Sequence, residues 1–229
     1  MKILAIIPAR GGSKGIPGKN IKLLGGKMLL QYTFDSANDS ALLTRIVLSS
    51  EDDTIIAAAQ KIGLEVPFKR PVELATDNAT SISVVQDAIA FFEKKGEYFD
   101  AICLLQVTYP FREKDFIDKA IQRFIETKVD ALVSVLPTPI EYNPHWMFEE
   151  IEDGTLKIAT GEEKIISRRQ DLPKTYYRDG AIYITKTEYI KEGTFYGSKL
   201  GYIESNPDLY VNIDTMEDWR KAEEKLKYL

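Results

Sequence analysis

The chain has 229 residues, a formal net charge of −5 and a hydrophobic content of 44%, which together exclude intrinsic disorder and fit one α/β domain. The acidic balance argues against nucleic acid as a partner, because a phosphate backbone needs a broad basic face. With one cysteine, no apolar run of about 18 residues and no signal-peptide pattern, we expect a cytoplasmic protein without disulfides or a membrane segment.

A glycine-rich basic loop follows the first predicted strand, at residues 3–7. The first 34 residues contain six basic side chains and no carboxylate. Glycines let a backbone approach an anion, successive N–H groups form a concavity for it, and Arg and Lys neutralise its charge. The loop differs from a Walker A loop, because Ser13 stands where that motif needs glycine and Asn20 where it needs Ser or Thr. It also lacks GxGxxG, so we expect a polyphosphate ligand but not a dinucleotide fold of that type.

Apolar runs and helical patterns alternate along the first 136 residues. Further runs typical of strands buried on both faces cover residues 45–49, 101–105 and 131–136. Helical spacing is found between them, at residues 28–38, 53–62, 81–95 and 114–127. This alternation predicts an α/β fold with a mostly parallel sheet flanked by helices.

The alternation breaks at about residue 137. Three prolines, several aromatic residues and the turn Asp153-Gly154 predict short strands or hairpins up to about residue 175. Such an irregular segment in a compact domain is typical of a functional excursion or an oligomer contact. Strands are predicted again at 180–185 and 199–204, and a helix at 216–226. We therefore predict a single domain, 1–229, with an inserted segment at about 137–175.

Five ordered motifs resemble those of the CMP-sialic acid synthetases, also called acylneuraminate cytidylyltransferases. They lie at residues 8–21, 70–81, 104–112, 168–184 and 213–218. Their order along nearly the whole chain makes the resemblance more specific than any single motif. The resemblance implies a Rossmann-like nucleotidyltransferase fold and a homodimer held by the inserted segment, so that the segment at about 137–175 would be the dimerisation segment.

The resemblance also implies a reaction, in which CTP and a nine-carbon 2-keto sugar acid give a CMP-sugar and pyrophosphate with Mg²⁺ or Mn²⁺. The implied sugar is N-acetylneuraminic acid or a relative such as legionaminic or pseudaminic acid. Three alternatives stay open: activation of the eight-carbon acid Kdo, another sugar nucleotidyltransferase, and a nucleotide-binding module without turnover. Against Kdo, Lys19-Asn20-Ile21 stands where Kdo synthetases typically have Lys-Pro-Leu.

The resemblance assigns a nucleotide site and catalytic residues to this chain. Its implied catalytic residues are Arg10, Lys19 and Asp214. The nucleotide site that it implies consists of Arg10, Gly11, Gly12, Ser13, Lys14, Lys19, Asn20, Arg70, Ala79 and Ser81. Charge stabilisation and positioning dominate in phosphoryl transfer, so cations on the triphosphate are what this chemistry requires.

A sugar site and a metal site follow from the same resemblance. Gln106 would touch the sugar acid. Arg169 and Arg178 would meet its carboxylate, which favours a bidentate guanidinium, or reach across the dimer. Asp214 is the implied metal ligand, and Asn212 stands two residues before it.

Two regions depart from the family pattern. The C-terminal motif usually has aspartate at the position of Asn212, whose amide oxygen can ligate Mg²⁺ without adding charge. Val107, Tyr109 and Phe111 replace the usual Pro, Ser and Leu, while Arg112 is kept. We expect these three residues to lie beside the sugar site and to bear on which sugar is used.

Overall fold

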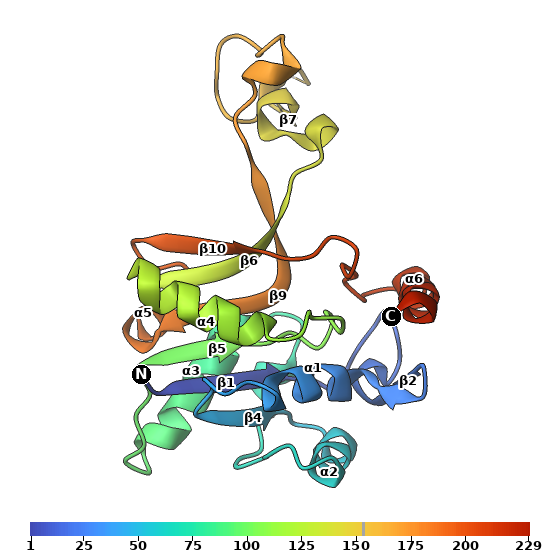
Figure 1. Ribbon diagram of the computed structural model, residues 1–229, viewed down its shortest axis with the longest axis vertical. Coiled ribbons are helices and arrows are strands. Elements are labelled where there is room, and N and C mark those ends of the chain that lie inside the picture. The colour runs from blue at the N-terminus through green and yellow to red at the C-terminus, as the bar shows by residue number, and fades with distance from the viewer. Residues whose placement is uncertain (153) are drawn as a thin grey trace.

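The computed structural model describes residues 1–152 and 154–229, so Asp153 of the predicted turn lies outside the described residues. Its body is a six-stranded sheet in the order β10-β6-β9-β5-β1-β4, flanked by helices (Figure 1). These strands are β1 (Ile3–Pro8), β4 (Arg45–Ser49), β5 (Ala101–Leu104), β6 (Ala131–Pro137), β9 (Tyr176–Lys186) and β10 (Leu200–Glu204). All described pairings in this sheet are parallel except the two that β9 makes with β5 and β6. The predicted, mostly parallel sheet is confirmed.

Helices cover both faces of this sheet. They are α1 (Leu29–Asn38), α2 (Asp53–Lys61), α3 (Ser81–Glu93), α4 (Phe116–Thr127), α5 (Thr187–Lys191) and α6 (Met216–Lys225). Strand β1 is buried on both sides, because Ile3, Ala5 and Ile7 belong to one apolar cluster and Leu4 and Ile6 to another. None of the described helices is long and apolar enough to cross a membrane.

The predicted element ends differ from the observed ends by two residues or fewer, except in β9. That strand begins at Tyr176, four residues before the predicted start at 180. Helix α2 illustrates why the other ends were predictable. The Asp52 carboxylate accepts hydrogen bonds from the backbone N–H groups of Thr54 and Ile55, at 2.8 and 3.0 Å, and so caps the helix.

A projection extends from the body where β6 ends and β9 begins (Figure 1). It contains short 3₁₀ turns and a two-stranded ribbon of β7 (Phe148–Glu150) and β8 (Leu156–Ile158). Pro137 and Tyr176 are paired across β6 and β9, so the chain leaves the sheet and returns to it at directly opposite positions of these two strands. A second small ribbon, β2 (Leu23–Leu24) and β3 (Lys27–Met28), lies beside α6.

A wide bulge interrupts β9 opposite β6. Val133 pairs with Tyr183 and Val135 with Arg178, so Ser134 alone faces the four residues 179–182. The Ser134 hydroxyl donates to a carboxylate oxygen of Asp179 and accepts from the N–H of Ile182 at 2.9 Å. Side-chain hydrogen bonds thus replace the missing strand ladder, and bulges of this kind commonly adjoin active sites.

Candidate active site

The basic loop leaves β1 at the carboxyl edge of the parallel strands, where open α/β sheets bind ligands. A cleft of about 240 Å³ opens there between the loop, the end of β5 and the segment before α6. It is lined by Pro8, Arg10, Ser13, Lys19, Asn20, Gln106, Val107, Thr108 and Asp214. The structure therefore brings the three predicted catalytic residues together with the predicted sugar contact Gln106.

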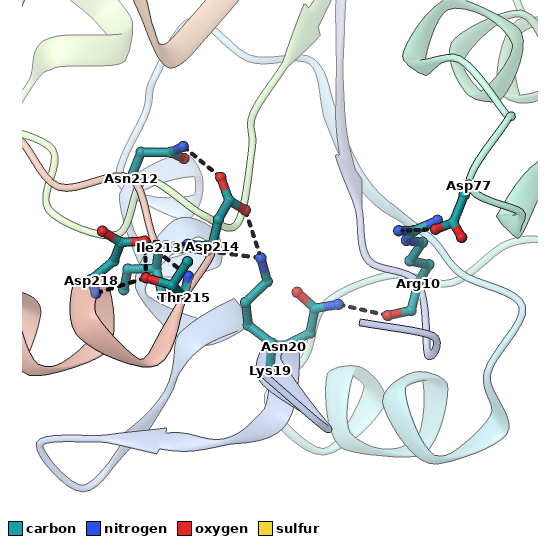
Figure 2. A network of polar contacts seen from close by, with 9 residues as sticks. All are labelled: Arg10, Lys19, Asn20, Asp77, Asn212, Ile213, Asp214, Thr215 and Asp218. Atoms are coloured by element: carbon teal, nitrogen blue, oxygen red, sulfur yellow. Dashed lines mark hydrogen bonds and ion pairs between the residues drawn. The ribbon is translucent and has the colours of Figure 1, made fainter. Parts of the chain in front are cut away.

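The loop is held by residues beneath it and beside it. The Asn20 side-chain amide donates to the carbonyl of Arg10 at 2.8 Å (Figure 2). The Gly11 N–H donates to Oε1 of Glu51 at 2.7 Å, so this donor points into the protein and not toward the cleft. A Cβ on Gly15 would lie 2.1 Å from the Asp214 carbonyl oxygen, so only glycine allows the loop to approach that segment so closely.

Arg10 and Lys14 are both paired with one carboxylate, that of Asp77 (Figure 2 shows the Arg10 pair). The Arg10 guanidinium lies 2.9 Å from Oδ1 of Asp77, and the Lys14 ammonium lies 2.5 Å from Oδ2. Hydrogen bonds from Lys14 and Arg10 lower the pKa of Asp77. Sequence reasoning did not identify this residue, because 67 positions separate it from Arg10 and only the fold brings them together.

Lys19, Asn212 and Asp214 form a second polar group on the opposite side of the cleft (Figure 2). The Lys19 ammonium donates to the Ile213 carbonyl at 2.8 Å and to Oδ1 of Asp214 at 3.0 Å. The Asn212 amide donates to the other oxygen, Oδ2, at 2.7 Å. The segment is fixed from below, because Thr215 and Asp218 form a capping box at the start of α6.

Asp214 and Asn212 are the residues of this group that could hold a metal, together with the phosphates of a nucleotide. Among residues 1–152 and 154–229, no cluster of three His, Cys, Asp or Glu side chains could hold a metal alone. Mg²⁺ is commonly bound through one or two protein oxygens, with phosphate oxygens and water completing the shell. The exposed Asp214 carboxylate and the amide oxygen of Asn212 supply such a donor set.

Arg70, a predicted nucleotide contact, lies beneath the loop and does not line the cleft. It is only 4% exposed, and its Nε donates to the Ser49 hydroxyl at 2.9 Å. Its guanidinium also lies 4.0 Å from the Glu51 carboxylate, which holds Gly11. Burial lowers the pKa of Arg70. In this structure Arg70 thus supports the floor on which the loop rests.

Two further residues of the predicted nucleotide site, Ala79 and Ser81, lie on the segment that carries Asp77. Ala79 donates its N–H to the Thr76 carbonyl at 3.2 Å, and Ser81 is the exposed first residue of α3. Neither lines the cleft. Both therefore flank the cleft on the Asp77 side.

Arg112 organises the turn that carries Gln106. This buried guanidinium donates to the carbonyls of Gln106, Tyr109 and Ala181 at 2.9, 2.7 and 3.0 Å, and to the Thr33 hydroxyl at 3.1 Å. Burial lowers the pKa of Arg112 to about 10. The residue ties the turn to α1 and to the β9 bulge. The sequence signal was the kept arginine that ends the motif at residues 104–112.

The same turn also reaches the metal segment, because the Thr108 carbonyl accepts the N–H of Ile213 at 2.9 Å. Of the three substituted positions, Val107 lines the cleft as expected. Tyr109 and Phe111 instead point into the core, where their rings lie against Tyr210 and Tyr32. The expectation that they lie beside the sugar site was wrong, because the turn directs their side chains inward.

The two remaining predicted sugar contacts, Arg178 and Arg169, do not line the cleft that contains Gln106. Arg178 is exposed on β9 next to the bulge, and its guanidinium donates to the Tyr196 hydroxyl at 3.2 Å. Arg169 lies in the projection, in a separate cleft of about 340 Å³ with Lys174 and Glu204. One chain therefore does not bring Arg169 to the cleft that contains Gln106.

Sequence comparisons relate this chain to known proteins. A family model described as cytidylyltransferase matches residues 4–224. A pseudaminic acid cytidylyltransferase of Campylobacter jejuni is 36% identical over 219 residues, which are 95% of this chain and 93% of the relative. A CMP-N,N'-diacetyllegionaminic acid synthase of Legionella pneumophila is 34% identical over 229 residues, covering 99% and 97%.

The fold has a close counterpart among solved structures. A CMP:2-keto-3-deoxy-manno-octonic acid synthetase complexed with CTP superposes with a TM-score of 0.72 at 14% identity. The match covers 100% of this chain and 99% of that chain. At this identity the likeness concerns the fold, and it confirms the predicted Rossmann-like nucleotidyltransferase architecture.

Proposed function

This chain belongs to the cytidylyltransferase family, and we propose that it joins CTP and a nonulosonic acid to give a CMP-sugar and pyrophosphate. The proposed sugar is pseudaminic, legionaminic or N-acetylneuraminic acid. The observation that carries the proposal is the cleft in which Arg10, Lys19 and Asp214 meet Gln106. Two relatives that align with nearly the whole chain are named for reactions of this class.

In the proposed reaction the anomeric hydroxyl of the sugar attacks the α-phosphorus of CTP. One O–P bond forms, the hydroxyl proton passes to water, and the bond to the bridging oxygen of the departing pyrophosphate breaks. Arg10 and Lys19 lie on opposite sides of the cleft, where they would offset the charge that builds up on the phosphates. Gln106, at the carboxyl end of β5, would orient the sugar acid.

The metal belongs to this proposal as well. Asp214 and Asn212 would hold Mg²⁺ or Mn²⁺, whose charge would offset that of the triphosphate. The position of the Asp214 carboxylate, between the Lys19 ammonium and the Asn212 amide, supports this choice.

We also propose a homodimer formed through the projection, in the cytoplasm, where CTP is made. The projection exposes several large apolar side chains, which a partner would cover. They are Tyr142, Met147, Phe148, Ile151, Leu156 and Ile165. The same association would give Arg169 a route to the sugar site of the second copy, which its own chain does not provide.

Pyrophosphate release tests the function directly. The purified protein would be supplied with CTP, Mg²⁺ and, in turn, pseudaminic, legionaminic, N-acetylneuraminic and Kdo acids. We expect release with at least one nine-carbon acid and little with Kdo. A matched series with GTP and a sugar phosphate serves as the nucleotide control.

Two results would overturn the proposal in favour of named alternatives. Release with Kdo alone, or with GTP and a sugar phosphate, would make the protein a different sugar nucleotidyltransferase. Tight CTP binding without release for any acid would indicate a nucleotide-binding module.

A further inference from the structure

We propose that Asp77 is an internal competitor of the triphosphate: its carboxylate occupies Arg10 and Lys14 in the free protein, and the nucleotide displaces it. The inference rests on the proposed function for the identity of the ligand. It concerns a residue to which no motif assigned a role, and it predicts how the affinity of the loop for phosphates is set.

The first argument is charge. The loop would present two cations to a phosphate chain, but Asp77 already binds both, one with each carboxylate oxygen, at 2.9 and 2.5 Å. A carboxylate that bridges two cations resembles a phosphate group in charge and in acceptor geometry. A triphosphate that used the same cations would also be repelled by Asp77 at close range, so the carboxylate must move for the two cations to serve the nucleotide.

The second argument is how weakly Asp77 is held. Its side chain is 48% exposed, and its described contacts are those with the two cations. Exposed ion pairs contribute little net free energy, so a highly charged ligand can replace them.

The third argument is position. Asp77 lies between η2 (Val72–Ala75) and α3, on the segment that also carries Ala79 and Ser81. The Arg10 guanidinium reaches the same segment through the Ala75 carbonyl at 3.4 Å. Release of Asp77 would therefore free the segment that flanks the cleft at the time the nucleotide enters it.

Calorimetric titration of the full chain without metal tests the inference. The ligands are CTP, pyrophosphate and cytidine, and the variants are Asp77→Asn and Asp77→Ser. We expect both variants to bind CTP and pyrophosphate about fivefold more tightly than the unmodified protein, since two exposed ion pairs no longer compete. Cytidine carries no phosphate, so its affinity should stay unchanged.

A matched control removes an equivalent carboxylate elsewhere. Asp35 is 41% exposed and pairs with Lys27 at 2.6 Å, away from the cleft, so Asp35→Asn should leave CTP affinity unchanged. In a protein that already carries Arg10→Ala, Asp77→Asn should raise the CTP affinity by a smaller factor, because one of the two ion pairs of Asp77 is already absent.

The outcomes separate the two proposals. Equal or weaker CTP binding by the Asp77 variants, with normal binding by the unmodified protein, would overturn the competitor role and leave the proposed function intact. A gain of the same size for cytidine would overturn it too, since phosphates would not be involved. Absence of CTP binding by the unmodified protein, both in this titration and in one with Mg²⁺, would instead overturn the proposed function.

Discussion

Arg10 and Lys19 reach the same cleft but are held to different degrees. The Lys19 side chain is 11% exposed and has two acceptors on the segment before α6. The Arg10 side chain is 35% exposed, and its partner Asp77 lies on another loop. Lys19 therefore joins two parts of the site, whereas Arg10 is the cation that is freer to follow a reacting phosphate.

Arg10→Ala should lower turnover by about two orders of magnitude, because a group that stabilises charge in the transition state is lost. Initial rates of pyrophosphate release at saturating CTP measure this. Lys69→Ala, which breaks an exposed ion pair with Asp53 at the start of α2, serves as the control for loss of one surface cation. Normal turnover in Arg10→Ala would show that Arg10 has no such role.

Asn212→Asp should strengthen metal binding, because it replaces a neutral oxygen by a charged one. The change also removes the amide that donates to Asp214 and places two carboxylates side by side. The variant should thus melt at a lower temperature in chelator and recover with Mg²⁺, and it should need less Mg²⁺ for half-maximal rate. If the metal titration and the melting temperature both match those of the parent, residue 212 lies outside the metal shell.

At the scale of elements, the site depends on three segments that contact one another: the basic loop, the turn after β5 and the segment before α6. Thr108 joins the last two through Ile213, and Lys19 joins the first and last. Gly15 marks the place where the loop touches the Asp214 backbone. A substitution that moves one segment should therefore also move the other two.

Gly15→Ala should lower turnover at least about tenfold, because its Cβ would force the loop away from Asp214, and small misplacements of reacting groups are costly. Gly12→Ala is the matched comparison, since a Cβ there meets nothing within 4 Å. The ratio of the two turnover numbers isolates the contact. Equal losses of turnover in the two variants would contradict a role for the contact between Gly15 and the Asp214 backbone.

Arg112→Met should destabilise the fold by about 2–4 kcal/mol, because it leaves three buried carbonyls without their charged donor. Urea unfolding followed by fluorescence gives this free energy. Replacement of the exposed Arg220 by Met should change it by less than about 0.5 kcal/mol. A similar small effect for Arg112 would mean that the turn keeps its shape without it.

Most elements were predictable because they are governed by local patterns. Apolar runs and helical spacing predicted the six strands of the sheet and five of the six described α-helices, with nearly all their ends, but not α5. The β9 bulge was not predictable, because its hydrogen bonds come from Ser134 and Asp179, which are 45 residues apart. The same reason explains the missed roles of Asp77 and Arg112. Six of the residues that the motifs named line the cleft, whereas Arg70, Ala79 and Ser81 do not. The motifs also did not predict the partners that hold the lining residues.

At the scale of the whole molecule, the projection stands clear of the body and exposes apolar side chains (Figure 1). The nucleotide cleft lies at the carboxyl edge of the sheet, and Arg169 lies in the projection. In the proposed dimer, a second copy would have to bring Arg169 to the sugar site.

Phe148→Glu combined with Leu156→Glu should convert the proposed dimer to a monomer, because charges would replace apolar side chains that are 52% and 63% exposed in one chain. Light scattering during gel filtration measures the mass. Tyr98→Glu, at an equally exposed apolar residue on the body, should leave the mass unchanged. A monomeric unmodified protein, or a double variant that keeps the dimer mass, would contradict the projection as the interface.

The pairing of Pro137 with Tyr176 has an evolutionary consequence. Because the projection starts and finishes at adjoining positions, it can be lengthened, trimmed or exchanged between homologous genes without altering the order of any strand in the sheet. Selection can therefore remodel the projection for a new quaternary arrangement while leaving the six-stranded sheet and the cleft at its edge as they were.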